Sequence, residues 1–406
     1  MSNAIPITPA RPRVEPGELV ARARAMVPYL RERALEAERQ RRISAETLAL
    51  FREAEFFRTL APARFGGFEY DFITMMDVLA EVGRGCGSSA WLCGLGIIHR
   101  WLLSLFPLEA QLDVWADDPD GIITGSYAPQ GIAQPEKGGY RIPAGKWSFS
   151  SGVDHSRWSV IGVMFPPGKD ETAPTRGLLL VPSTDYTLED DWYASGLCGT
   201  GSKTIVISDV FVPGHRKLTF PQAVSGSAPG TRAHANPIYK VSFMAGMPCA
   251  LAAPGFGIVQ GAIDDALASI SKQLTRGAAG GAGNRVADYA AVQSRMAEAT
   301  ACLDAAKLLL YRDCNELLAT VRSGESVSVD MRIRNRRNHA FAVRLAVQAA
   351  DALYESTGGR GLYLDNAVQR AWRDIHAVSK HIALNWDAVS TMTGQHLLGL
   401  EPKGTY

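Results

Sequence analysis

Apolar and polar positions divide the chain into three parts, and the first is helical. In Gly17–Arg42 the apolar side chains recur at helical spacing, which predicts an amphipathic helix. Ser44 is placed to cap a second helix over Ala45–Ala54, because its hydroxyl can accept from a free amide of the first turn. Ser88–Phe106 is apolar on nearly every side, a pattern typical of a helix enclosed within a domain.

The second part changes to short runs rich in β-branched and aromatic residues. Clusters of glycine and proline such as Pro166–Gly168 and Gly199–Ser202 separate them. Short strands between such turns predict a small antiparallel sandwich or barrel. The runs are Ile122–Tyr127, Lys146–Ser151, Trp158–Phe165, Gly177–Val181 and Thr204–Val212.

The third part returns to long amphipathic segments. Val286–Val321, Met331–Thr357 and a last helix or pair over Val368–Leu398 predict a helical bundle. The fold class is therefore α+β. We expect an extended or disordered tail over 1–16, an N-terminal α-helical domain over 17–120, a central β-domain over 121–236 and a C-terminal helical bundle over 237–406.

The composition indicates which binding partners and which cell compartment to expect. The chain has 406 residues, 46% hydrophobic and 20% charged, and its net charge of +1 gives no reason to expect nucleic acid or an acidic membrane as partner. We expect no apolar run long enough to cross a bilayer, and no secretory signal in residues 1–16. The six cysteines form no CxxC pair, which indicates buried free thiols in a reducing compartment, the cytoplasm.

Two segments carry the candidate chemistry. In Gly145–Gly152 strand alternation predicts that Trp147, Phe149 and Ser151 share one face, where an aromatic beside a hydroxyl suits a planar, heteroatom-rich ring. An ordinary amphipathic strand explains this segment alone at least as well. In Trp372–His376 a histidine lies on a late helix, on one face with Lys380, whereas His381 is expected to point elsewhere.

Together these segments resemble the oxygenase component of two-component flavin monooxygenases. That family has the acyl-CoA dehydrogenase-like fold, with an N-terminal helical domain, a central β-sandwich or barrel and a C-terminal four-helix bundle. The resemblance implies that a separate flavin reductase supplies reduced FMN or FAD. With O2 the flavin forms a 4a-hydroperoxyflavin that hydroxylates a small aromatic substrate, expected to be a phenol. It also implies a homotetramer, and it implies no metal.

The resemblance further implies the site residues. His376 would be the catalytic base and substrate contact, with Ser151 at flavin N5 and His99 as a second substrate contact. The other flavin contacts would be Trp91, Ser126, Phe149, Ser150, Arg276, Ser356, Thr357 and Gly358. Each has a structural alternative: core packing for Trp91, His99 and His376, a turn before Pro129 for Ser126, a solvated charge for Arg276, and a glycine cap for the turn at Gly358.

Other functions stay open at this point. An acyl-CoA dehydrogenase-like desaturase needs a carboxylate base, and counting from Arg373 and Asp374 that position falls on Ile382. The missing carboxylate makes a desaturase less favoured but does not exclude it, because some relatives carry the base on another helix. An N- or S-oxygenase of the same fold remains possible. A non-enzymatic binding protein would lack the flavin face, yet Ser126, Ser151 and His376 are present.

Overall fold

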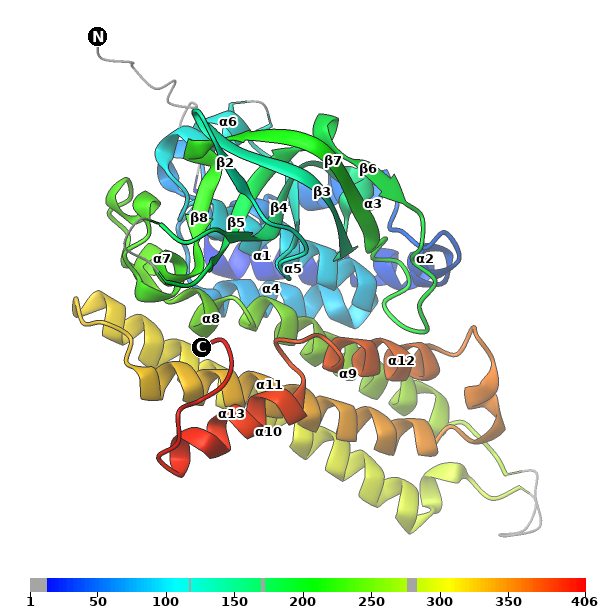
Figure 1. The fold of residues 1–406 in the computed structure, drawn as a ribbon. Coiled ribbons are helices and arrows are strands. Elements are labelled where there is room, and N and C mark those ends of the chain that lie inside the picture. Colours follow the sequence, from blue (N-terminus) through cyan, green and yellow to red (C-terminus); the bar gives the residue numbers. More distant parts are fainter. Residues whose placement is uncertain (1–12, 117, 169–171, 276–282) are drawn as a thin grey trace.

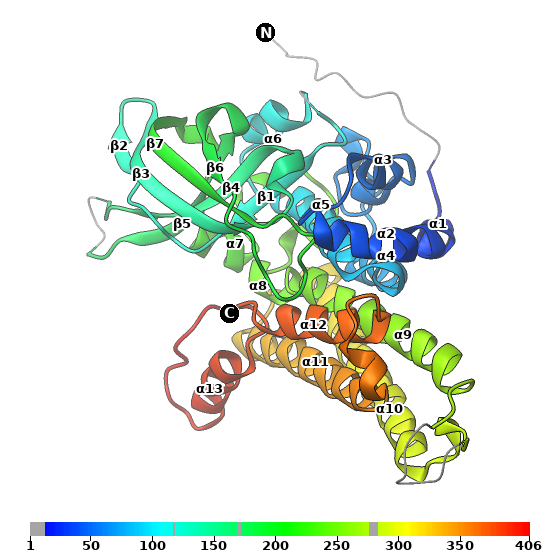
Figure 2. The same cartoon turned by 90° about the vertical axis from the view of Figure 1, so that its right-hand side faces the viewer.

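The computed structural model describes residues 13–116, 118–168, 172–275 and 283–406. Figures 1 and 2 show two layers: the β-domain and the first helices lie on one side, and the last helices on the other. Helices α8 (Phe243–Gly246) and α9 (Cys249–Ile270) run between these layers. The site described below is built from both layers.

The N-terminal part is helical as the sequence predicts, but the stretch Gly17–Arg42 forms two helices that meet at Met26 instead of one. Ser44 caps α3, with its hydroxyl accepting from the amide of Thr47 at 3.1 Å. Every residue of α5 is buried, as its apolar sequence predicts. The helices are α1 (Pro16–Ala25), α2 (Val27–Arg39), α3 (Ala45–Glu53), α4 (Phe72–Gly85), α5 (Gly87–Leu103) and α6 (Leu108–Trp115).

The β-domain consists of two four-stranded sheets. The first has the order β1 (Ile122–Ser126), β4 (Ser156–Phe165), β5 (Thr175–Pro182), β8 (Lys217–Thr219). The second has the order β2 (Gln134–Glu136), β3 (Gly139–Ser150), β7 (Lys203–Pro213), β6 (Thr187–Glu189). All five predicted strands are present, and the three short strands β2, β6 and β8 were not predicted.

The expectation of purely antiparallel pairing is wrong at one position. Strands β1 and β4 pair in parallel, with Ile123 opposite Trp158 and Ser126 opposite Ile161. Between them the chain crosses to the second sheet to form β2 and β3, and then returns in the same direction. This crossover gives a parallel pair in a domain whose other pairs are antiparallel.

The predicted common face of Trp147, Phe149 and Ser151 is also wrong, because a bulge interrupts β3. Trp147 lies opposite Ile205 and Ser150 opposite Lys203, so β3 carries an extra residue between these pairs. Phe149 adopts a left-handed backbone with φ 64° and is 71% exposed. Trp147 is fully buried between the sheets and donates from its indole nitrogen to the carbonyl of Gly162 at 2.7 Å.

The C-terminal part is the predicted bundle. Helices α9, α10, α11 and α12 pack against one another, and the predicted last segment is a pair, α12 and α13. The remaining helices are α7 (Phe220–Ser225), α10 (Ala290–Arg322), α11 (Val329–Glu355), α12 (Ala367–Ser379) and α13 (Trp386–Leu397).

One helical stretch contradicts the expectation that no apolar run is long enough to cross a bilayer. Phe243–Ile270 is long and apolar enough to cross a membrane, contrary to the sequence analysis. However, 89% of its most apolar window is buried inside the fold. A helix enclosed between two layers needs apolar residues on every side, which explains this composition.

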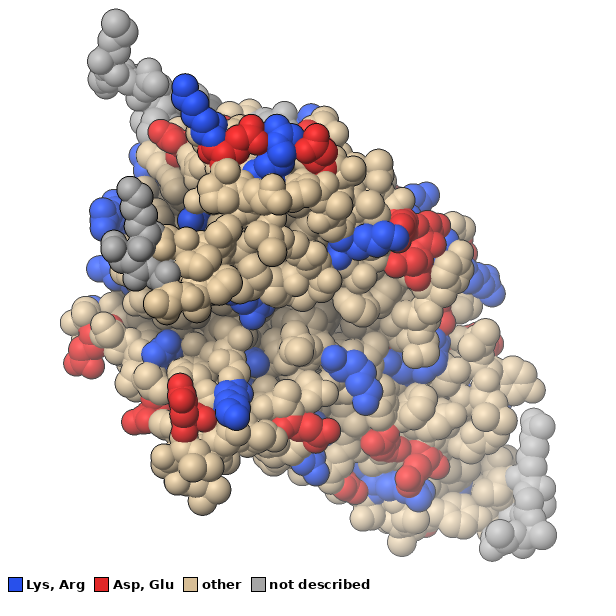
Figure 3. Space-filling model, viewed as in Figure 1, with Lys and Arg blue, Asp and Glu red and all other residues tan. Residues whose placement is uncertain are grey.

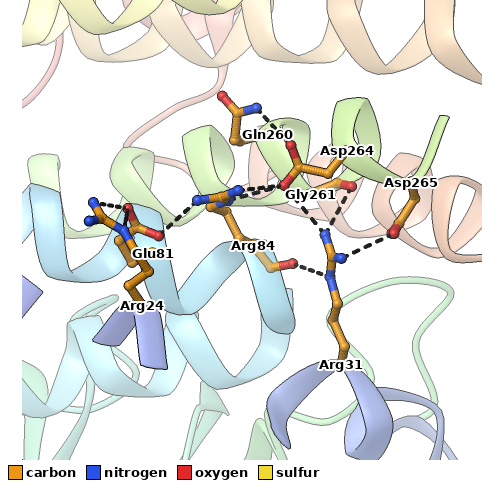
Figure 4. Close-up of polar contacts among 8 residues, drawn as sticks. All are labelled: Arg24, Arg31, Glu81, Arg84, Gln260, Gly261, Asp264 and Asp265. Carbon is orange, nitrogen blue, oxygen red and sulfur yellow. Dashed lines mark hydrogen bonds and ion pairs between the residues drawn. The ribbon is translucent and has the colours of Figure 1, made fainter. Parts of the chain in front are cut away.

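An ion-pair network attaches the first helices to α9 (Figure 4). Arg84 of α4 pairs with Asp264 of α9 at 2.8 Å and with Glu81 at 3.1 Å. Arg31 of α2 pairs with Asp265 at 3.3 Å and donates to the carbonyl of Arg84. These charges are partly buried, so the network fixes α2 and α4 on the central helix more firmly than isolated surface pairs would.

Candidate active site

A chain of hydroxyl groups joins α5 to the β-domain beneath the bulge in β3. The Ser151 hydroxyl accepts from the indole nitrogen of Trp91 at 3.2 Å and lies 2.6 Å from the Ser202 hydroxyl. Its carbonyl accepts from the Thr124 hydroxyl at 2.7 Å. The structure therefore brings together two predicted flavin contacts, Trp91 and Ser151, that are 60 positions apart in sequence.

The predicted flavin contacts next to Ser151 differ in their exposure and in the groups that they bond. Ser126 donates to the carbonyl of Ser148 at 2.8 Å and stays partly exposed. The ring of Phe149 faces the edge of Trp192, with centroids 6.2 Å apart. Ser150 is fully buried and donates to the carbonyl of Trp147, so its hydroxyl serves the bulge itself. An exposed aromatic ring beside hydroxyl groups fits a planar ring that has both apolar and polar edges.

His99 lies on the same stripe of α5 as Trp91 and Leu95, at intervals of four residues. It is 1% exposed, and its Nδ1 lies 2.5 Å from the carbonyl oxygen of Ile123. Burial lowers the pKa of His99 to about 4, so the ring is neutral at neutral pH. A carbonyl only accepts, so Nδ1 carries the proton and Nε2 presents a lone pair. His99 is thus suited to accept a hydrogen bond.

Aromatic rings continue from His99 toward α8. The ring of Tyr127 meets His99 edge to face at 5.7 Å and Phe243 at the same distance. The Tyr127 hydroxyl is buried without a hydrogen-bond partner among the described residues. A buried hydroxyl without a partner is costly, so this hydroxyl is available to bond a ligand atom or a water molecule.

His376 faces α11 rather than this cluster. Its Nε2 lies 2.9 Å from a carboxylate oxygen of Asp351, which also accepts from the indole nitrogen of Trp372. The His376 side chain is 34% exposed. Within the described parts of the chain, no hydrogen bond or ring contact joins His376 to Trp91 or Ser151. Its predicted catalytic role stays a prediction.

His381 is the histidine that the structure places against Trp91. The two ring centroids are 5.7 Å apart, and Nδ1 of His381 accepts from the amide of Ala383 at 3.1 Å. Burial, and then the nearby Arg336 guanidinium, lowers the pKa of His381 to about 4. Helix α12 ends at Ser379 and Asn385 caps α13, so His381 lies in the break between them. The break between the two helices is the feature of the sequence that distinguishes His381 from His376.

The glycine-rich segment Gly196–Lys203 positions this region. Asp374 of α12 accepts from the amide of Leu197 at 2.7 Å and is buried. A Cβ on Gly196 would lie 2.2 Å from the carbonyl oxygen of Arg373, so only glycine allows this close approach. The segment docks the β-domain on α12, and Asp374 serves this contact rather than pairing with His376.

The remaining predicted flavin contacts lie elsewhere. Ser356 and Thr357 follow α11 and donate to the carbonyls of Ala352 and Tyr354. Gly358 has φ 58° and open space around it. Among the described residues, this turn makes no hydrogen bond to the hydroxyl chain at Ser151. Arg276 lies outside the described residues.

Comparisons with known proteins agree with this fold. Residues 18–117 match the acyl-CoA dehydrogenase N-terminal domain, and residues 249–386 match its C-terminal domain. The chain is 42% identical to the oxygenase component of an FADH(2)-dependent resorcinol hydroxylase from Rhizobium sp. (strain MTP-10005), covering 100% of this chain and 99% of that protein. It is 37% identical to the oxygenase subunit HsaA from Rhodococcus jostii (strain RHA1), covering 93% and 97%.

The chain belongs to the oxygenase components of the flavin-dependent monooxygenases. The structure of the 3-HSA hydroxylase from Rhodococcus sp. RHA1 matches it with a TM-score of 0.89 at 36% identity, covering 96% of this chain and 98% of that one. XiaF from Streptomyces sp., solved with FADH2 and glycerol, matches with a TM-score of 0.86 at 27% identity, covering 96% and 97%. The enzyme is a flavin-dependent monooxygenase, and the desaturase alternative loses its support.

Proposed function

We propose that this oxygenase hydroxylates a small phenolic substrate, using O2 and reduced FAD from a separate flavin reductase. The FADH(2)-dependent resorcinol hydroxylase and the XiaF complex with FADH2 favour FAD over FMN. The observation that carries the phenolic substrate is the neutral His99, whose Nε2 keeps a lone pair and whose ring meets that of Tyr127 edge to face. A phenol supplies the O–H donor that this lone pair can accept a hydrogen bond from.

The residues around the bulge of β3 would hold the flavin ring. Phe149 and Trp91 would pack on the ring, while Ser126 and Ser151 would bond its polar edge. Bound reduced flavin supplies the two electrons that activate O2. The buried hydroxyl chain at Ser151 and the apolar wall of α5 keep water away from the reacting atoms.

The two histidines would divide the work on the substrate. A hydrogen bond from the phenolic hydroxyl to Nε2 of His99 would make the substrate ring more electron-rich and so easier to hydroxylate. His381 would contact the substrate or flavin through Nε2, because its Nδ1 already accepts from Ala383. We keep the catalytic role of His376 as a competing prediction.

The rest of the assembly follows from the same proposal. The turn at Ser356, Thr357 and Gly358, with Arg276, would reach the flavin phosphates of a neighbouring subunit in a cytoplasmic homotetramer. A guanidinium suits this task because its planar fork matches phosphate oxygens.

The test is a coupled assay with a purified flavin reductase, a nicotinamide and a panel of phenols. We expect hydroxylated product with reduced FAD, and less with reduced FMN. Oxidation of an acyl-CoA thioester with an artificial electron acceptor, without any product from phenols, would contradict the proposal.

A further inference from the structure

Two buried cysteines from different helices touch at the start of α9. Cys249 is the first residue of α9 and Cys314 lies within α10, 65 positions further along the chain, yet their sulfur atoms are only 3.4 Å apart. Their exposed fractions are 0% and 1%, and both thiols are free. The sequence predicts buried free thiols, and the structure adds that two of them are in contact.

An imidazole adjoins this pair. Nε2 of His339, which is fully buried on α11, lies 3.1 Å from the sulfur of Cys249. A consistent set of hydrogen bonds runs from the Cys314 thiol to the Cys249 sulfur, and from the Cys249 thiol to Nε2, with the proton of the neutral ring on Nδ1. Each of the helices α9, α10 and α11 supplies one member, so the packing of the bundle holds the three groups together.

In the reduced protein this cluster is neutral. The adjacent Cys314 thiol, and then burial, raise the pKa of Cys249 well above its usual range. Burial, and then the nearby Arg336 guanidinium, lower the pKa of His339 to about 3. A thiolate is therefore not stored at rest, and Cys249 can react as a nucleophile only while its proton moves to the imidazole.

The surroundings of His339 are polar although they are buried. Nδ1 of His339 and both polar side-chain atoms of Asn335, one turn earlier on α11, have no hydrogen-bond partner among the described residues. Buried polar atoms in proteins usually bond other protein groups or ordered water. Hydrogen peroxide is close to water in size and in hydrogen bonding, so this part of the interior suits it as well.

The surface is recessed near the start of α9. Figure 3 shows a hollow between the β-domain and the bundle, at the level where Figure 1 places α8. Only Met247 and Pro248 separate α8 from Cys249 along the chain. A small neutral oxidant can approach along this boundary, whereas the burial of both thiols keeps larger disulfide reagents away.

We infer that Cys249 and Cys314 form an oxidation site at which hydrogen peroxide closes a disulfide between α9 and α10, with His339 relaying the proton of Cys249. A flavin-dependent monooxygenase releases this oxidant itself whenever its flavin is oxidised without hydroxylation. The inference does not depend on which substrate is hydroxylated. In a reducing compartment such a bond is transient, which is typical of redox-sensing disulfides rather than of structural ones.

The chemistry balances in two steps. The Cys249 sulfur attacks one peroxide oxygen, so an S–O bond forms, the O–O bond breaks, and the departing oxygen takes the proton relayed by His339 and leaves as water. The Cys314 sulfur then attacks the resulting sulfenic acid. The S–S bond forms, the S–O bond breaks, and the hydroxyl group takes the Cys314 proton and leaves as a second water molecule. Two thiols are thus oxidised while one peroxide is reduced.

The geometry favours closure of this bond. The sulfur atoms must move from 3.4 Å to the roughly 2.05 Å of a disulfide. Cys249 follows Pro248 at the end of its helix, where the backbone can shift more easily than within a helix. In addition, Asp313 beside Cys314 accepts from Asn338 at 2.7 Å and so ties α10 to α11, the helix that carries His339.

Mass spectrometry of the purified full-length protein tests the site without flavin, substrate or activity. The reduced, folded protein is treated with hydrogen peroxide, the remaining thiols are alkylated under denaturing conditions, and the digested peptides are compared. We expect one peptide pair joined through Cys249 and Cys314, and recovery of both thiols after dithiothreitol. Cys93, which is fully buried and has no thiol or imidazole bonded to it among the described residues, should be alkylated as before.

Cys302→Ser is the matched control. Cys302 is a partly exposed thiol on the same helix as Cys314, so this variant should form the cross-link as the wild type does, whereas Cys314→Ser should form none. Recovery of Cys249 and Cys314 as free thiols after peroxide has oxidised Cys302 would overturn the proposal. A cross-link that forms only in the unfolded protein would overturn it too. The wild type alone gives the decisive result, so a variant that does not fold leaves the test intact.

His339→Gln tests the proton relay. Glutamine can still bond the Cys249 thiol but cannot take up its proton, so the cross-link should form at least about tenfold more slowly. If His339 only packed, the looser interior of the variant would admit peroxide more readily, and the cross-link would form at least as fast as in the wild type. That result would remove His339 from the proposal.

Discussion

His376 and His381 lie close together in sequence, yet the end of α12 at Ser379 sends them to different places. His376 turns to Asp351 and Trp372 on the outside of the bundle, and His381 turns to Trp91. Periodicity within one helix predicts which face a residue occupies, but not where the chain goes once the helix stops. The sequence therefore separated the two histidines correctly without showing which one meets Trp91.

The same residues provide a paired test. His381→Ala should lower the product formed per flavin oxidised by on the order of 10², with flavin oxidation continuing as hydrogen peroxide release. His376→Ala should lose stability through the Asp351 contact and keep its product yield. The yields are measured from product and peroxide together. A normal yield in folded His381→Ala, with a reduced yield in His376→Ala, would restore the sequence-based assignment.

Ser151 and Trp91 illustrate what sequence reasoning can and cannot find at the residue scale. The resemblance named both as flavin contacts, and the structure joins them by a hydrogen bond. The expected face shared with Trp147 and Phe149 fails because the bulge in β3 adds a residue. A bulge depends on the partner strand β7, which alternation within one segment does not describe.

At the scale of elements, the long helices and strands were predictable from the sequence, and the short edge strands were not. Long helices and strands leave a run of apolar positions that is easy to recognise in sequence, as α5 and β4 do. Strands β2, β6 and β8 have three residues each, too few for alternation to show. The parallel pairing of β1 and β4 depends on a crossover through the other sheet, which local patterns do not encode.

The contact between Gly196–Lys203 and α12 predicts a pH dependence. Burial raises the pKa of Asp374 from 3.8 to about 6, although the amide of Leu197 favours the ionised form. Between these values the unfolded chain has lost the proton while the folded chain keeps it, so stability falls as pH rises from about 4 to about 6. The loss amounts to about 2–3 kcal/mol.

Asp374→Asn should remove this part of the pH dependence, because the amide keeps an acceptor for Leu197 without titrating. The measurement is the free energy of unfolding in urea across that pH range. Asp304→Asn, at an exposed position on α10, is the control and should follow the wild type. Parallel curves for wild type and Asp374→Asn would contradict the assignment.

At the scale of the whole molecule, the bundle exposes apolar side chains that a subunit interface would cover. Leu308 of α10 is 71% exposed, Leu397 of α13 is 74% exposed and Leu398 is 78% exposed. We expect light scattering at micromolar concentration to give a homotetramer.

Charged substitution should weaken this assembly. Leu397→Glu combined with Leu398→Glu should give smaller species, whereas Leu188→Glu, at a 40% exposed position in β6, should leave the mass unchanged. A monomeric wild-type protein would contradict the predicted tetramer and the shared flavin site with it.

The order of helical domain, β-domain and bundle was predictable because each of these three parts has its own hydrophobic pattern, and the family resemblance follows this order. The placement of Ser151 and His381 against Trp91 was not, because α5, β3 and the break after α12 meet only in the folded chain.

The most direct test of the central claim is a single turnover with chemically reduced FAD, isotopically labelled O2 and a phenol such as resorcinol. The geometry predicts a hydroxylated phenol that contains one labelled oxygen atom, formed only when protein, reduced flavin and O2 are all present. Complete flavin oxidation to hydrogen peroxide, with no labelled product from any phenol of the panel, would contradict it.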